Sequence, residues 1–241
     1  MSKRTTSEIL SNERLSKDFC LMRAECPNDA RMGQFYMIRA WGSYPVLSRP
    51  VSVFDTDGAT VSFLYKVVGK GTEIFAALKP GDEITLDGPL GNTFPDLSGN
   101  IAMVGGGVGI APFYLTAREL KTRHPDCRVD LYLGFSDQAL PVDNYRKVAD
   151  GVVVDVGGFI TDSIEPERYE HIFTCGPEVM MRSLYGKCER AGVADRLYVS
   201  MENRMACGVG ACFVCSCKTS AGNKKVCKDG PVFRGKEVFG L

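Results

Sequence analysis

The sequence lacks an excess of either charge and any long apolar run. Its 29 lysines and arginines balance 29 aspartates and glutamates, so the formal net charge is +0 and a general nucleic-acid binder is not expected. No apolar stretch approaches the length of a membrane span, and the charged residues 1–15 contain no apolar signal core. We therefore expect a soluble, cytoplasmic protein that binds neither nucleic acid nor membrane.

Histidine is scarce, whereas cysteine is plentiful. Only His124 and His171 are present, and neither belongs to a recognisable catalytic pattern. Of the 10 cysteines, several crowd into the stretch CGVGACFVCSCKTSAGNKKVC, between Cys207 and Cys227. In a reducing cytoplasm such crowding favours metal binding or redox chemistry over disulfides. An iron–sulfur cluster, a zinc site and a disulfide knot are the three interpretations.

The spacing within this stretch favours the iron–sulfur cluster. Cys207, Cys212, Cys215 and Cys227 follow C-x4-C-x2-C-x11-C, and the first part of this pattern matches the plant-type [2Fe–2S] spacing. Two irons need four thiolates, which these cysteines supply, and Cys217 is left as a spare. Zinc is the main alternative, but structural zinc sites usually add a second close pair or histidines. A disulfide knot is the remaining alternative.

The pattern of apolar residues divides the chain into three parts. Residues 1–98 show short alternating strands between turn residues, with one helix over 72–79, which predicts an antiparallel β-barrel. Residues 99–200 alternate continuous apolar strands with helices, which predicts the parallel sheet of an α/β domain. Residues 201–241 show no regular period and form the cysteine segment.

A glycine-rich turn, MVGGGVGIAP, joins a strand to a helix in the second part. It lets the backbone approach a pyrophosphate at the helix N-terminus, although a ligand-free turn is the alternative. Asp137, near the end of the next strand, is placed to hold a ribose hydroxyl, and no arginine stands there for a 2′-phosphate, which favours NAD over NADP. The predicted residues of the turn are Gly105, Gly106, Gly107, Gly109 and Pro112.

A second anion site is predicted in the first part. Arg49, in SRPVS, can hold a phosphate through its planar guanidinium, although such an arginine is also compatible with a surface turn. Gly71 and Thr72 begin the predicted helix, whose first amides can bind an anion. Two phosphate-anchoring features ahead of a nucleotide domain favour a dinucleotide such as FAD.

The remaining cysteines and the C-terminal lysines carry weaker signals. Cys175 ends a strand in TCGP, where ligands of parallel sheets gather, and is predicted to line the nicotinamide site. Buried apolar roles are expected for Cys20, Cys26, Cys127 and Cys188. Four lysines surround the cysteine loop and are expected either to form a solvated face or to steer docking of a partner and tune the reduction potential: Lys218, Lys224, Lys225 and Lys228.

In chain order, the motifs RPVS, GKGT, GGGVGIAP, CGP and the cysteine cluster resemble the ferredoxin–NADP reductase superfamily. DGPLGNTF, ACGVGACFVC and CKDGPVF resemble, in particular, the electron transfer subunits of class 1B dihydroorotate dehydrogenases, along essentially the whole chain. The resemblance implies a [2Fe–2S] cluster on the four cysteines and NAD against residues 105–112 and Cys175, Gly176 and Pro177. It implies FAD on Arg49, Pro50, Val51, Ser52, Leu64, Tyr65, Lys66, Gly71 and Thr72.

The resemblance also implies how the cofactors work together. FAD exchanges a hydride with nicotinamide and passes single electrons, so it links NAD to the one-electron cluster. The chain is too short to add a (β/α)8 barrel of roughly 250 residues, so an FMN-containing dihydroorotate dehydrogenase catalytic subunit is expected as the partner, in a heterotetramer. We expect the cluster at that interface, with CFVC and VFRGKEVFGL offering apolar contact.

Two alternatives stay open. One keeps the cofactors and changes the partner, as in a flavin subunit of a hydrogenase or of a ferredoxin–NAD(P) oxidoreductase. The other is a non-enzymatic binding module with zinc in the tail and a vacant nucleotide fold.

Overall fold

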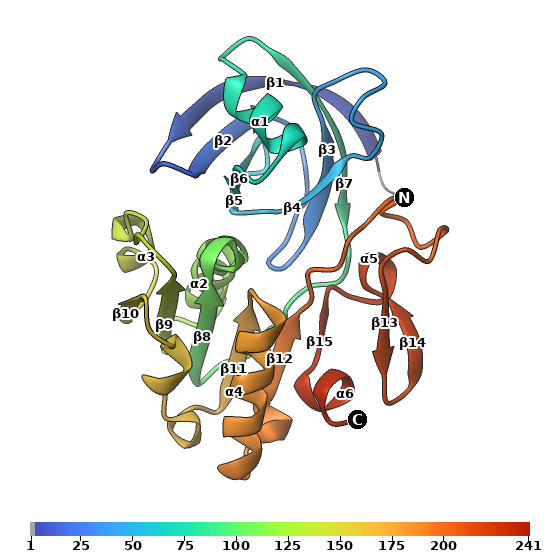
Figure 1. Ribbon diagram of the computed structural model, residues 1–241. Helices are drawn as coiled ribbons and strands as arrows, with labels where there is room; N and C mark the ends of the chain where they lie inside the picture. The colour runs from blue at the N-terminus through green and yellow to red at the C-terminus, as the bar shows by residue number, and fades with distance from the viewer. Residues whose placement is uncertain (1–2) are drawn as a thin grey trace.

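The computed structural model describes residues 3–241, which form two large sheets and one C-terminal hairpin (Figure 1). The first sheet and helix α1 occupy the upper part of the view, and the second sheet with its helices lies below them. The cysteine segment runs along one side of both. Within the described residues, no helix is long and apolar enough to cross a bilayer.

The first sheet confirms the antiparallel arrangement predicted for the N-terminal part and curls into a half-barrel. Its order is β4-β3-β7-β1-β2-β6-β5, and every neighbouring pair is antiparallel. Burial alternates along β7, so one face packs on a core and the other faces outward. The strands are β1 (Lys3–Arg14), β2 (Phe19–Glu25), β3 (Phe35–Arg39), β4 (Arg49–Ser52), β5 (Asp55–Thr56), β6 (Thr60–Lys66) and β7 (Glu83–Leu90).

Helix α1 (Lys70–Ala77) packs on the inner face of this half-barrel through Phe75, which is fully buried. It begins two residues before the predicted helix. The Thr72 hydroxyl accepts hydrogen bonds from the amides of Val68 and Gly69 at 2.9 and 3.2 Å, and these bonds cap the helix at this earlier position. The helix ends at Ala77, two residues before the predicted end, and Leu78 is already extended ahead of the Pro-Gly pair, which cannot continue the hydrogen-bond ladder.

The second sheet confirms the predicted parallel arrangement and adds one antiparallel edge. Its order is β10-β9-β8-β11-β12-β15, and only the β12–β15 pair is antiparallel. The main helices are α2 (Ala111–Arg123), α3 (Asp143–Arg146) and α4 (Glu178–Arg190). The strands are β8 (Asn100–Gly106), β9 (Arg128–Phe135), β10 (Gly151–Val156), β11 (His171–Cys175), β12 (Leu197–Ser200) and β15 (Val232–Arg234).

The cysteine segment contains short regular elements that the sequence pattern did not predict. They are β13 (Ser216–Thr219), β14 (Gly222–Lys225), α5 (Val226–Asp229), β15 and α6 (Gly235–Phe239). None is long enough to develop a readable apolar period. Because β15 pairs with β12, the end of this segment belongs to the second sheet, and the division of the chain at residue 201 stays a prediction.

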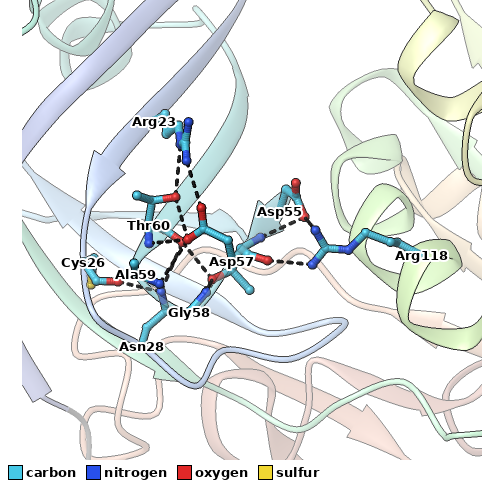
Figure 2. A network of polar contacts seen from close by, with 10 residues as sticks. Arg23, Cys26, Asn28, Asp55, Asp57, Gly58, Ala59, Thr60 and Arg118 are labelled. Atoms are coloured by element: carbon cyan, nitrogen blue, oxygen red, sulfur yellow. Dashed lines mark hydrogen bonds and ion pairs between the residues drawn. The ribbon is translucent and has the colours of Figure 1, made fainter. Parts of the chain in front are cut away.

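The two halves are held together by a polar and aromatic contact between the β5–β6 region and α2. Arg118 of α2 pairs with Asp55 at 2.5 Å and donates to the Thr56 carbonyl at 2.6 Å (Figure 2). Phe54 stacks on Tyr114 with ring centroids 4.6 Å apart. Asn92, just after β7, adds a second contact, because its side chain donates to the Val232 carbonyl at 2.8 Å and accepts from the Val232 amide at 2.9 Å.

Candidate functional site

A cavity of about 630 Å³ opens where the half-barrel, the second sheet and the cysteine segment meet. This volume falls within the usual range for cofactor sites. Its wall brings together most of the predicted FAD residues, from β4, β6 and α1: Arg49, Pro50, Val51, Ser52, Leu64, Tyr65, Lys66 and Thr72. The Tyr65 ring itself lies in the barrel core, where its hydroxyl bonds to Asn12 Oδ1 at 3.0 Å.

Arg49 and the first turn of α1 form one corner of this cavity. A Cβ on Gly71 would lie 2.6 Å from Arg49 Nε, so glycine is needed for the guanidinium to approach the helix. Among residues 3–241, no carboxylate forms an ion pair with Arg49. A positive charge without a counter-ion, beside a helix N-terminus, fits a phosphate group of FAD.

The predicted NAD residues meet at the carboxyl edge of the second sheet. Cys175 of β11 pairs in register with Gly105 of β8 and with Ser200 of β12. A Cβ on Gly109 would lie 2.5 Å from the Cys175 carbonyl oxygen, so the glycine turn and the CGP turn interlock. Gly107, at φ +56°, has open space beside it and leaves its backbone accessible.

The other predicted NAD residues lie around this edge. Pro112 is buried in the first turn of α2, and Gly106 approaches Pro177 so closely that a Cβ would lie 2.9 Å from its Cδ. Gly176 has φ +140° and faces the Gly106 backbone. Asp137 is exposed just beyond β9, and its role stays a prediction.

Cys175 does not line the cavity directly, but its hydrogen-bond partner does. The fully buried thiol donates to Glu202 Oε1 at 3.4 Å, and Glu202 forms part of the cavity wall. Burial, then the nearby carboxylate, raises the pKa of the Cys175 thiol well above its usual range, so the sulfur stays protonated. Surrounding protein also raises the pKa of Glu202, although this residue is exposed to the open cavity.

The four predicted cluster cysteines lie on one loop and the short helix α5, with backbone amides directed at their sulfurs. The Gly210 amide donates to Cys227 Sγ at 3.1 Å, and the Ala211 and Cys212 amides donate to Cys207 Sγ at 3.3 and 3.4 Å. Such donors stabilise negative charge on sulfur, which suits thiolates that bind iron. Gly208 and Gly210 allow the loop to turn, with φ of +71° and +80°.

The cysteines form an outer and an inner pair. Cys207 is half-buried and Cys212 exposed, whereas Cys215 and Cys227 are buried, and the Cys227 amide donates to Cys215 Sγ at 3.4 Å. Burial opposes ionisation of Cys207, but amide hydrogen bonds outweigh it and lower its pKa to about 6. Within residues 3–241, no group of three or more His, Cys, Asp or Glu side chains is arranged to hold a metal ion, so the ligand set stays a prediction.

The other predictions for this segment have mixed outcomes. Cys217 is buried in the core of the second half, and its Sγ contacts the Lys218 carbonyl. The prediction that VFRGKEVFGL offers apolar contact to a partner is wrong for Val232, Phe233, Val238 and Phe239, which are only 5–7% exposed and pack internally, whereas Leu241 is 62% exposed. His124 lies at the end of α2, paired with Asp96 at 2.9 Å, as expected of a helix-end residue.

Sequence reasoning missed a large part of the cavity wall. Residues 200–205, which read SMENRM, line it directly after β12. The signal was available, because ligands of parallel sheets collect beyond the carboxyl ends of the strands. Phe35 and Pro231 also contribute, and nothing in the local sequence marks them.

Comparisons with known proteins agree with this geometry. Residues 202–239 match the family model of the iron–sulfur cluster binding domain of dihydroorotate dehydrogenase B. The electron transfer subunit of dihydroorotate dehydrogenase B (NAD(+)) from Clostridium acetobutylicum is 43% identical over 246 residues, covering 98% of both chains. That of Caldanaerobacter subterraneus is 34% identical and covers 97% of both.

Solved structures show the same architecture. An NADH-dependent reduced ferredoxin–NADP oxidoreductase has a TM-score of 0.86 and 31% identity, covering 96% of this chain and 89% of its own. A ferredoxin–NADP⁺ reductase from Neisseria gonorrhoeae with bound FAD and NADP has a TM-score of 0.67 at 20% identity, covering 85% and 96%. The chain thus has the ferredoxin–NADP reductase fold and belongs to the family of dihydroorotate dehydrogenase B electron transfer subunits.

Proposed function

We propose that this chain passes electrons from the FMN of a dihydroorotate dehydrogenase catalytic subunit, through a [2Fe–2S] cluster and FAD, to NAD⁺. One observation carries the proposal. Residues 200–205 form a wall of the predicted FAD cavity and lead directly into Cys207, the first cysteine of the loop. A flavin and a cluster held by adjacent residues would lie close together, as electron transfer requires.

The residues of the cavity bind and orient. When bound, FAD supplies the chemistry that exchanges a hydride with nicotinamide and single electrons with the cluster. Arg49 and α1 hold a phosphate, and β4 and β6 form the walls. The protonated Cys175 holds Glu202 at the sheet edge. The glycine turn at residues 105–109 offers backbone amides, without a charged side chain, to NAD.

The cysteine loop also packs against the half-barrel. A Cβ on Gly208 would lie 2.7 Å from Met37 Cγ and 3.1 Å from Leu90 Cδ1, so the loop rests on β3 and the end of β7. Amide hydrogen bonds to the sulfurs would raise the reduction potential of a bound cluster, because they stabilise its more negative, reduced form.

The outer face of the loop is suited to a partner subunit. Val209, Phe213 and Val214 are 52%, 65% and 53% exposed, which is unusual for large apolar residues so close together in sequence. Lys225 covers one side of the Phe213 ring at 4.6 Å, so one lysine of the segment packs beside this patch. We place the catalytic subunit there, in the heterotetramer that the resemblance implies.

The test uses the complex with its FMN subunit, purified anaerobically. We expect dihydroorotate to reduce NAD⁺, followed by absorbance at 340 nm. Cys212→Ser should abolish this activity while NADH still reduces ferricyanide through FAD, because only the route through the cluster is cut. Cys217→Ser, the matched control, should keep both activities. A Cys212→Ser complex that still couples dihydroorotate to NAD⁺ would contradict the proposal.

The likeness to an NADH-dependent reduced ferredoxin–NADP oxidoreductase supports a second candidate with the same cofactors and a different partner. Affinity purification from cells separates the two, because the first predicts an FMN-containing subunit and the second a ferredoxin-reducing one. The zinc-stapled binding module predicts a colourless protein with stoichiometric zinc, whereas either redox function predicts flavin, iron and sulfide.

A further inference from the structure

Trp41, the only tryptophan in the chain, lies close to two guanidinium groups. Cζ of Arg39 lies 5.5 Å from the ring centroid, and Cζ of Arg49 lies 5.3 Å from it. Both distances fall within the cation–π range of about 6 Å. Arg49, the proposed phosphate ligand, is therefore supported by an aromatic face.

Trp41 is itself fixed from several sides. Its Nε1 donates to the Pro45 carbonyl, and the Arg39 guanidinium donates to the carbonyls of Trp41 and Val46 at 3.1 and 2.9 Å. The ring also packs on Phe75 of α1, with centroids 5.5 Å apart. The β3–β4 loop, β4 and α1 are thus joined through this one side chain.

There is no room for a further atom where Gly71, Trp41 and Arg49 meet. A Cβ on Gly71 would lie 2.9 Å from Trp41 Cη2 as well as 2.6 Å from Arg49 Nε. The indole ring, the guanidinium and the first turn of α1 therefore contact one another. A long arginine side chain without such support would lose considerable rotational freedom on binding a phosphate.

We propose that Trp41 is a positioning residue for the FAD phosphates: it holds the Arg49 guanidinium against the first turn of α1 before the cofactor arrives. This rests on the proposed FAD site and adds a residue that none of the predicted motifs contains. Trp41 acts through Arg49 and not on the flavin ring.

A double-mutant cycle tests this role in the full chain after removal of flavin, with FAD binding followed by flavin fluorescence. Trp41→Leu should weaken FAD binding about five- to tenfold, and Arg49→Gln more strongly. In the Arg49→Gln background, Trp41→Leu should change little, because the residue that it supports is gone. Trp41→Phe, which keeps an aromatic face, should restore most of the affinity.

Two comparisons separate positioning from general support of the fold. Gly71→Ala should weaken FAD binding, because its methyl group displaces both side chains, whereas Gly69→Ala, which meets open space, should not. Riboflavin, which carries no phosphate, should bind the Trp41→Leu and unsubstituted chains equally. Additive losses in the cycle, or equal losses for riboflavin and FAD, would overturn the proposal.

The design keeps the two proposals distinguishable. An unsubstituted chain that binds no FAD would contradict the proposed function, whereas FAD binding unaffected by Trp41→Leu would contradict only the role of Trp41. Circular dichroism reports whether each variant is folded. If Trp41→Leu does not fold, the Trp41→Phe and Gly71→Ala affinities decide the question.

Discussion

The two glycine-rich corners that we propose as anion sites are built differently. At α1, an arginine without a counter-ion lies against the first helical turn, and glycine makes room for its guanidinium. At the start of α2, Gly105 and Gly106 make room for uncharged side chains, and Gly109 makes room for the backbone of the turn after β11. The first site combines charge and helix dipole, whereas the second has amides alone.

This difference suits the proposed ligands. A resident cofactor benefits from a charged, pre-organised anchor, because its binding energy is retained through every turnover. A nicotinamide substrate has to leave after each hydride transfer, so a site without a formal charge is appropriate. Substitutions at the two sites should therefore affect FAD and NADH binding separately.

The largest effect is expected at Arg49. Arg49→Gln should weaken FAD binding about 30- to 100-fold, corresponding to the roughly 2–3 kcal/mol of a charge-assisted phosphate contact. NADH affinity, measured in chains saturated with FAD, should stay within twofold. Flavin titration and NADH titration of the same variant give both values. Comparable losses at both sites would show that the two anion sites are not independent.

Gly109→Ala should have the opposite selectivity. The new methyl group would meet the Cys175 carbonyl at 2.5 Å and the Gly176 Cα at 2.5 Å, both rigid backbone atoms. We expect a loss of about 1–3 kcal/mol in unfolding free energy and weaker NADH binding, with FAD affinity retained. Thermal denaturation and ligand titration measure the two effects. An unchanged unfolding free energy would mean that the turns after β8 and β11 can move apart to accommodate the methyl group without a loss of stability.

Arg118→Gln tests the contact between α2 and the half-barrel. The pair with Asp55 is about one-third exposed on both sides, so its contribution to stability should be about 1 kcal/mol or less. FAD and NADH should each bind normally, while the rate of hydride transfer, followed by stopped-flow bleaching of the flavin, should fall severalfold. Lys121→Gln, which removes a comparable pair with Asp150 outside the contact, is the control.

The smallest effect is expected at the turn that carries this contact. Asp57 accepts hydrogen bonds from the Thr60 amide and hydroxyl, and also from the Ala59 amide and the Arg23 guanidinium (Figure 2). Together these hydrogen bonds lower the pKa of Asp57 to about 2. The stabilisation is therefore present above the ordinary aspartate pKa near 4 and is lost as the pH falls towards 2. Asp57→Asn should have a lower denaturation midpoint at neutral pH, and the difference should shrink over that range. Glu25→Gln, on neighbouring β2, is the control for a general loss of charge.

The fold class was predictable from the sequence because the apolar period changes near residue 99, where the second sheet begins at Asn100. Arg49 and Thr72, which line the cavity, could be named as candidates because their chemistry can be read without coordinates. Trp41 and Glu202 were not, since their partners, Arg49 and Cys175, are brought to them only by folding. Four apolar residues near the C-terminus were misread, because apolar residues look alike in sequence whether they pack within the chain or against another.

The position of β15 determines how the cysteine segment is held. β12 ends at Ser200 and β15 begins at Val232, and these two residues are paired in the second sheet. Both ends of the intervening stretch, residues 201–231, are therefore attached to neighbouring strands of one sheet. A displacement of this sheet edge would move the cavity wall at residues 201–205 and the cysteine loop together.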